Sequence, residues 1–207
     1  RSLLFSLLEI DEEGDVLSDL GEEIQQDLIS NISNDELAEA VKELELDEVV
    51  DILQNLPEDR MKKILSKMSL RDRQRIELGL TYPDDTAGGL LNTDVISVRP
   101  SHTMEVVINY LRGQDELPEN TDKIFVVSKE DKYVGELSIS KIITSKLSLT
   151  VREVMETNIL PIVVDQEDKE VAILFERNDL VSSAVIDESG KLIGRITIDD
   201  VVDVIRE

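Results

Sequence analysis

Apolar residues recur at helical spacing through residues 1–80, and helix-start signals interrupt them at short intervals. The predicted starts suit the exposed N–H groups of a first turn, through acceptor side chains, acids or a proline. They lie 10–13 residues apart, at Asn34, Asp47, Pro57 and Ser69. Helices this short are unstable alone, so the pattern predicts a helical array or superhelix.

Beyond this region the pattern changes to short strand-like runs that alternate with amphipathic helices. One copy reads "DVISVRPSHTMEVVINYL" and then "KIFVVSKEDKYVGELSISKII". The second reads "NILPIVVDQEDKEVAILFERNDL" and then "SSAVIDESGKLIGRITIDDVVDVI". Gly135 and Gly194 are equivalent, 59 residues apart, and each opens the second strand of its hairpin. The chain therefore contains a predicted internal β-α-β-β-α repeat.

The stretch "TYPDDTAGGLL" separates the two patterns and is predicted to be a linker. Gly88 and Gly89 permit backbone angles that other residues resist, and Pro83 stiffens the entry. We therefore expect this segment to allow the two halves to move.

Composition narrows the function classes. The 207 residues carry a net charge of −24 and only 3% aromatic residues, so nucleic acid would be repelled and would find few stacking surfaces. The absence of cysteine excludes disulfides and thiolate metal sites. No apolar run approaches a bilayer span of about 18–20 residues. A chain that begins at Arg1 and ends within a helical pattern is expected to be a piece of a longer protein.

Acidic residues form two groups with helical spacing. Asp47 and Asp51 lie one turn apart, and the final helix carries a second group, Asp199, Asp200, Asp203 and Glu207. Two such acidic faces repel each other unless a cation lies between them, and Mg²⁺ prefers carboxylate oxygens. Two simpler roles remain open for these acids. Asp47 could cap its helix, and the other carboxylates could be exposed to solvent without any ligand.

Two stretches carry a resemblance to known families. "VIDESGKLIGRIT" and "GRITIDDVVDVI" resemble the hairpin and closing strand–helix of CBS domains. "YPDDTAGGLL" is similar to the Y-P-E-D-T-A-G-G-L-M segment of MgtE-type magnesium transporters. This resemblance implies a multidomain protein, in which an all-α helical superhelix precedes an α/β tandem CBS-domain pair. The implied parts are an acidic N domain at 1–80, a linker at 81–91, CBS domain 1 at 92–148, and CBS domain 2 with the start of a connecting helix at 149–207.

The resemblance implies a regulatory role and no enzyme activity. The chain would be the Mg²⁺-sensing cytosolic region of a magnesium transporter, on the inner side of the cell membrane. It would form a homodimer through its CBS domains and act on a transmembrane pore of the same parent chain. Mg²⁺ bridging the N domain and the CBS pair would hold the pore closed, and low Mg²⁺ would release it.

Family ligand positions correspond to acids of both regions. The resemblance implies Mg²⁺ ligands at Asp47, Asp51, Asp179, Asp200 and Asp203. Asp15 stands where the family has Glu and Glu167 where it has Asp, while Asp199 joins the acidic surface of the last helix.

Two other functions remain open. A CBS-type module can sense adenine nucleotides, and Gly194, Thr197 and Asp200 keep the G-x-x-T-x-x-D pattern that holds a ribose. In the first repeat Lys141 replaces that Asp and cannot accept a hydroxyl proton, which makes ATP a weak candidate. The helical array could instead be a scaffold that binds a partner protein. His102, the single histidine, gives no catalytic constellation.

Overall fold

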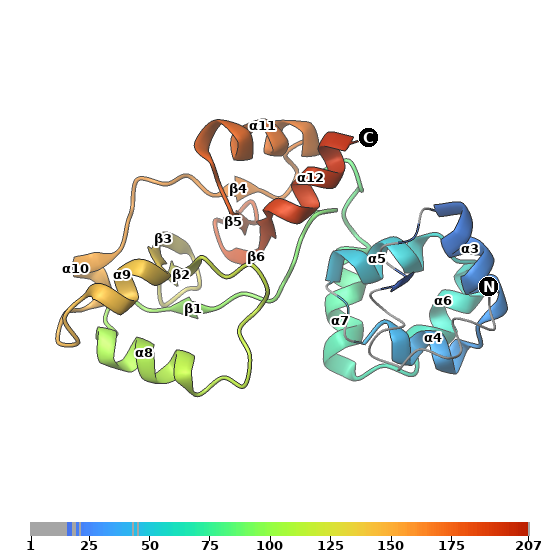
Figure 1. Cartoon of the computed structure of the whole chain (residues 1–207), viewed down its shortest axis with the longest axis horizontal. Coiled ribbons are helices and arrows are strands. Elements are labelled where there is room, and N and C mark those ends of the chain that lie inside the picture. Colours follow the sequence, from blue (N-terminus) through green and yellow to red (C-terminus); the bar gives the residue numbers. More distant parts are fainter. Residues whose placement is uncertain (1–15, 18–19, 21, 43, 45, 207) are drawn as a thin grey trace. The chain divides into compact units, whose positions relative to one another are not determined.

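The computed structural model describes residues 16–17, 20, 22–42, 44 and 46–206. The chain divides into two compact units, Arg1–Thr81 and Tyr82–Glu207. The first unit runs from blue to blue-green in Figure 1, and the second runs from green to red.

Short helices make up the first unit, as the spacing of start signals predicts (Figure 1). Each predicted start is confirmed to within one residue. Ser33 caps α4 by accepting from the backbone of Glu36 over 3.2 Å, and the Glu36 side chain accepts from the Ser33 backbone over 2.9 Å. The labelled helices are α3 (Glu22–Asn31), α4 (Asn34–Ala40), α5 (Leu46–Gln54), α6 (Glu58–Leu65) and α7 (Leu70–Gly79).

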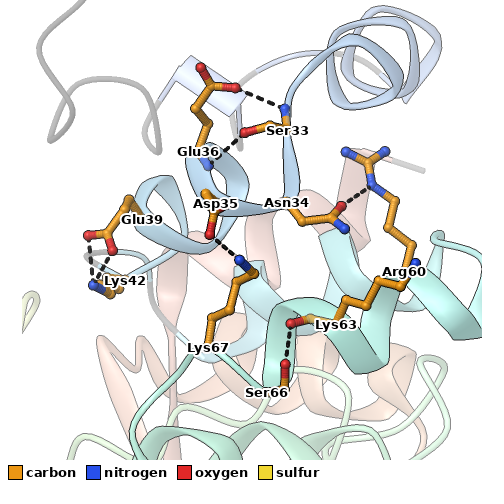
Figure 2. Close-up of polar contacts among 10 residues, drawn as sticks. All are labelled: Ser33, Asn34, Asp35, Glu36, Glu39, Lys42, Arg60, Lys63, Ser66 and Lys67. Carbon is orange, nitrogen blue, oxygen red and sulfur yellow. Dashed lines mark hydrogen bonds and ion pairs between the residues drawn. The ribbon is translucent and has the colours of Figure 1, made fainter.

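Apolar faces of these helices share one core. Leu37, Ile52 and Ile64 are fully buried in it, from α4, α5 and α6 respectively. A polar contact also joins α4 to α6: Arg60 donates to the Asn34 side chain over 3.0 Å (Figure 2). Lys67, just after α6, also pairs with Asp35. Packing of amphipathic faces therefore stabilises helices that are too short to be stable alone.

The second unit contains the predicted repeat twice. Its two three-stranded sheets have the orders β1-β2-β3 and β4-β5-β6, each with one parallel and one antiparallel pairing. Val126 lies opposite Gly135 in one sheet, and Val185 lies opposite Gly194 in the other, so the predicted glycine equivalence is confirmed. The strands are β1 (Ser97–Val98), β2 (Lys123–Val127), β3 (Tyr133–Ser138), β4 (Ile162–Val163), β5 (Ser182–Ile186) and β6 (Leu192–Thr197).

Helices cover each sheet and close a separate apolar core. Val107 and Ile142 are buried against the first sheet, and Phe175 and Val201 against the second. The two hairpin turns meet, because the Tyr133 amide donates to the Gly190 carbonyl over 3.0 Å. The helices are α8 (Met104–Arg112), α9 (Ile139–Thr144), α10 (Val151–Val154), α11 (Asp168–Asn178) and α12 (Ile198–Arg206).

Residues 82–92 form part of the second repeat. Ala87 and Leu91 are buried in its core, and Asn92 exchanges two backbone hydrogen bonds with Arg195, over 2.9 and 2.8 Å. Gly88 and Gly89 do not have positive φ angles, so the predicted reason for these glycines is wrong. A Cβ at Gly88 would lie 2.4 Å from Cγ of Tyr82, and close packing is therefore what requires glycine there.

The segment before the second repeat packs on the first repeat in the same way. Glu156 exchanges two backbone hydrogen bonds with Glu136, over 2.8 and 2.9 Å. The Arg152 amide donates to the Pro100 carbonyl, just as the Gly88 amide donates to the Val164 carbonyl. The preceding segments and the residues after the first strand of each repeat are offset by 64 positions, and the hairpins by 59, so the two repeats can be compared residue by residue.

Candidate functional site

Helix α5 carries two of the predicted metal ligands in different surroundings. Asp47 lies in its first turn and is only 9% exposed, where a carboxylate suits the positive end of the helix. Asp51 lies one turn later and is exposed, and its carboxylate accepts from the Gln54 side chain over 3.1 Å. Asp51 is thus the more accessible of the two to an incoming ion.

Helix α12 carries the predicted ligands at the other end of the chain. Asp199 is exposed and accepts from the Asn120 side chain over 2.9 Å. Asp200 accepts from the amide and the hydroxyl of Thr197, over 3.2 and 2.9 Å, and so closes the first turn of the helix. Asp203 belongs to α12, but its side chain lies outside the described part of the chain, and Asp15 lies outside the described residues.

The remaining two predicted ligands lie at the two ends of α11. Glu167 is the exposed N-cap, and its backbone pairs with Thr86 of the preceding segment. Asp179 ends the helix in a left-handed conformation, with a φ of 50°. A helix of 11 residues is about 16 Å long. One ion cannot contact both ends of α11.

The described residues supply the right kind of oxygen but no complete metal centre within either unit. Carboxylates are the ligands that Mg²⁺ prefers, and the predicted residues fit the ion in that respect. Within the described ranges, no cluster of three or more Asp, Glu, His or Cys side chains could hold a metal ion. The predicted set of eight ligands remains a prediction.

The first repeat contains a buried ion pair that no pattern in the sequence predicted. Lys123 and Glu136 lie on neighbouring strands, and Nζ of Lys123 lies 3.0 Å from Oε1 of Glu136, with both side chains less than 10% exposed. Burial raises the pKa of the Glu136 carboxyl, and the Lys123 ammonium partly opposes that shift. The sequence does carry one indication of this pair, because Glu136 interrupts the strand-like stretch "YVGELS" and a buried carboxylate needs a partner.

The nucleotide pattern differs between the repeats as the sequence predicts. Thr197 is buried and hydrogen-bonded to Asp200 in the second repeat. In the first repeat, Lys141 stands at the position of Asp200. Its ammonium lies 2.5 Å from a carboxylate oxygen of Glu156. That ion pair takes the position where a ribose acceptor would stand.

Comparison with known families agrees with this division of the fold. The MgtE intracellular N domain matches residues 1–85, and the CBS domain matches residues 87–147 and 151–207. The chain belongs to the MgtE family. It carries that family's N domain, followed by two CBS domains.

Curated relatives named magnesium transporter MgtE extend beyond this chain. The protein from Bacillus subtilis is 27% identical over 205 residues, which cover 99% of the chain and 46% of that relative. The protein from Thermus thermophilus is 33% identical over 135 residues, or 65% of the chain and 30% of that relative. The chain thus spans less than half the length of either one. No helix within the described residues is long and apolar enough to cross a membrane.

Solved structures match both units together. The cytosolic domain of the Mg²⁺ channel MgtE in complex with ATP has a TM-score of 0.92 and 31% identity, over 99% of this chain and 84% of that one. The soluble part of a magnesium transporter has a TM-score of 0.89 and 25% identity, over 98% and 80%. The helical unit followed by the CBS pair is therefore the architecture of MgtE cytosolic regions.

Proposed function

We propose that the chain is the Mg²⁺-sensing cytosolic region of a magnesium transporter and acts without catalysis. One observation carries this proposal: both units match the cytosolic domain of a Mg²⁺ channel over 99% of the chain. The parent protein would add a transmembrane pore, and the CBS pair would form the contact within a homodimer.

Charge provides the mechanism of sensing. A net charge of −24 makes close approach of the acidic helical unit and the acidic CBS helices unfavourable. Bound Mg²⁺ supplies the positive charge that cancels this repulsion. Asp47 and Asp51 would contribute carboxylates from α5, and Asp200 and Asp203 from α12.

Coupling to the pore follows from linkage. Ions bind most strongly to the arrangement that brings carboxylates of both units together, so high Mg²⁺ increases its population. We propose that this arrangement keeps the pore closed. When Mg²⁺ falls, carboxylate repulsion separates the units and releases the pore.

Calorimetry with MgCl₂ tests the proposal directly. We expect MgCl₂ to release or absorb heat of binding, whereas NaCl at the same ionic strength should give none. Thermal unfolding gives a second readout: one site adds about 2.7 kcal/mol when free Mg²⁺ is about 100 times its dissociation constant. Identical melting temperatures in MgCl₂ and in ionic-strength-matched NaCl would mean that the ions only screen charge.

Nucleotide sensing is the second candidate, and the bonded Thr197–Asp200 pair favours it. The matched MgtE cytosolic domain was solved with ATP. We propose that any ribose contact in this chain is confined to the second repeat, because Lys141 and Glu156 pair at the equivalent place in the first. Titration with ATP in the absence of Mg²⁺, repeated with Asp200→Ala, distinguishes this function from ion sensing.

A further inference from the structure

Beside the hairpin of each repeat, the backbone hydrogen bonds match but the side chains differ in chemistry. Backbone equivalence relates Arg152 to Gly88 and Ser101 to Asp165, since the flanking hydrogen bonds recur 64 positions apart. Register in the two hairpins relates Ser128 to Asp187. Because the fold is the same at both places, it does not itself require either set of side chains.

In the second repeat, an aromatic ring of the chain itself occupies this place. A Cβ on Gly88 would lie 2.4 Å from Cγ of Tyr82, so the tyrosine ring lies directly on that glycine. Tyr82 also packs against the second core. Burial raises the pKa of the Tyr82 hydroxyl, and the nearby carboxylates of Asp187 and Asp165 raise it further. Tyr82 therefore lies among Gly88, Asp165 and Asp187.

In the first repeat, the equivalent place is an open cavity of about 520 Å³. Arg152, Ser101 and Ser128 line it, and these are the counterparts of the three residues around Tyr82. Pro100, Val134 and Met155 add apolar walls. The cavity thus has apolar sides at the position that holds a planar ring in the other repeat.

Basic side chains give this cavity a chemistry that the second repeat lacks. Arg99, Lys129 and Arg152 line it, and the hairpin and backbone equivalences place Val163, Glu188 and Gly88 at the matching positions. Only one acid, Glu130, is among the lining residues. Three basic residues in one cavity stand out in a chain with 22 basic and 46 acidic residues.

Hydrogen bonds within the protein use only part of the Arg99 guanidinium. Its Nη2 donates to Asp131 over 2.7 Å, which fixes the guanidinium at the cavity wall. Its Nη1 is buried and has no hydrogen-bond partner among the described residues. Neither Lys129 nor Arg152 forms an ion pair with any described side chain. Guanidinium groups bind phosphate through parallel hydrogen bonds, and several together favour a doubly charged group.

We propose that this cavity binds a small molecule with a planar ring and a phosphate group. The ring lies between Pro100, Val134 and Met155, as the Tyr82 ring lies in the second repeat. The phosphate accepts hydrogen bonds from Arg99 and Arg152. This site is distinct from the Thr197–Asp200 pair, because its lining comes from the first repeat and from the α10 segment that packs on it, whereas that pair lies at the end of β6 in the second repeat.

Calorimetry with phenyl phosphate tests the proposal, with inorganic phosphate and phenol as separate probes of charge and ring. Phenyl phosphate is expected to bind at least about tenfold more tightly than either fragment. Arg99→Gln and Arg152→Gln should each weaken it by about tenfold or more. Arg112→Gln, on the exposed end of α8, is the matched control and should leave the affinity unchanged. Thermal unfolding of each variant confirms that it folds.

Several results would overturn the proposal. Equal affinities for phenyl phosphate and inorganic phosphate would show that charge alone attracts the ligand. Unchanged binding by Arg99→Gln and Arg152→Gln, or a loss as large in Arg112→Gln, would remove the cavity as the site. Loss of binding in Asp200→Asn with full binding in Arg99→Gln would place the ligand at the Thr197–Asp200 pair instead.

Discussion

The backbone amide and the hydroxyl of Thr197 both donate to the same carboxylate oxygen of Asp200, over 3.2 and 2.9 Å. This arrangement closes the first turn of α12 without any ion. A residue predicted from family resemblance to bind Mg²⁺ therefore also has a structural task. Substitutions at Asp200 must therefore distinguish its proposed role in Mg²⁺ binding from its role in stabilising α12.

Asp200→Ala is expected to lower the free energy of unfolding by about 1 kcal/mol in EDTA, because the turn loses its acceptor. Asp200→Asn keeps an acceptor oxygen at the same place and should lose less than half of that. Urea unfolding followed by circular dichroism measures both. Equal losses in the two variants would show that the charge of Asp200, rather than its hydrogen bonds, stabilises α12.

Asp51→Asn and Asp203→Asn should each weaken Mg²⁺ binding by about tenfold, because an amide oxygen is a poorer ligand for this hard cation than a carboxylate. Both residues belong to the predicted metal set, on α5 and α12. Calorimetry with MgCl₂ gives the affinities.

Two exposed acids outside that set, Asp27 and Asp115, provide the controls. Asp27→Asn and Asp115→Asn each remove the same unit of charge and should leave the affinity nearly unchanged. If all four variants bound Mg²⁺ equally less well, diffuse charge rather than a defined site would attract the ion.

Gly194→Ala should lower the free energy of unfolding by about 1–3 kcal/mol. A Cβ there would lie 2.3 Å from Cδ1 of Leu91 and 2.5 Å from the carbonyl oxygen of Asn92. The added methyl group would therefore push residues 82–92 away from β6. Gly113→Ala is the control, because its nearest neighbour would be 3.4 Å away and its φ of −87° suits any residue. Chemical denaturation of both variants distinguishes steric exclusion from a general need for glycine.

Lys123→Met should destabilise the second unit by about 3–5 kcal/mol near neutral pH, because it leaves the buried Glu136 carboxylate without its partner. Burial raises the folded-state pKa of Glu136 above the ordinary carboxyl value of 4.5, so the folded state holds that proton more strongly than the unfolded state. Stability therefore falls as pH rises from 4.5 through the raised pKa, and the fall should be steeper in the variant.

The double variant Lys123→Met/Glu136→Gln isolates that effect. Replacing the carboxyl with a neutral amide should restore most of the stability and remove the steeper pH dependence. Thermal unfolding between pH 4 and pH 8 provides the measurement. A double variant as unstable as Lys123→Met would assign the loss to packing of the lysine stem.

The sequence by itself determined the local elements and their repetition. Helix starts at Asn34, Pro57 and Ser69 follow from capping chemistry within a few neighbouring residues, and such signals can be read from the chain. The repeat also follows from sequence, because the same alternation of strand and helix recurs around Gly135 and Gly194. The "YPDDTAGGLL" stretch identified the family for the same reason, since a contiguous motif needs no tertiary contact to be recognised.

Only the tertiary structure decided what individual side chains do, because their partners are distant in the sequence. Residues 82–92 pack into the second repeat, and Gly88 is there for its lack of a side chain against Tyr82 rather than for flexibility. The buried Lys123–Glu136 pair depends on the register between two strands. The basic cavity gathers Arg99, Lys129 and Arg152 from three separate segments. Spacing along the chain can place a residue on an element, but packing between elements determines its burial, its partners and its charge environment.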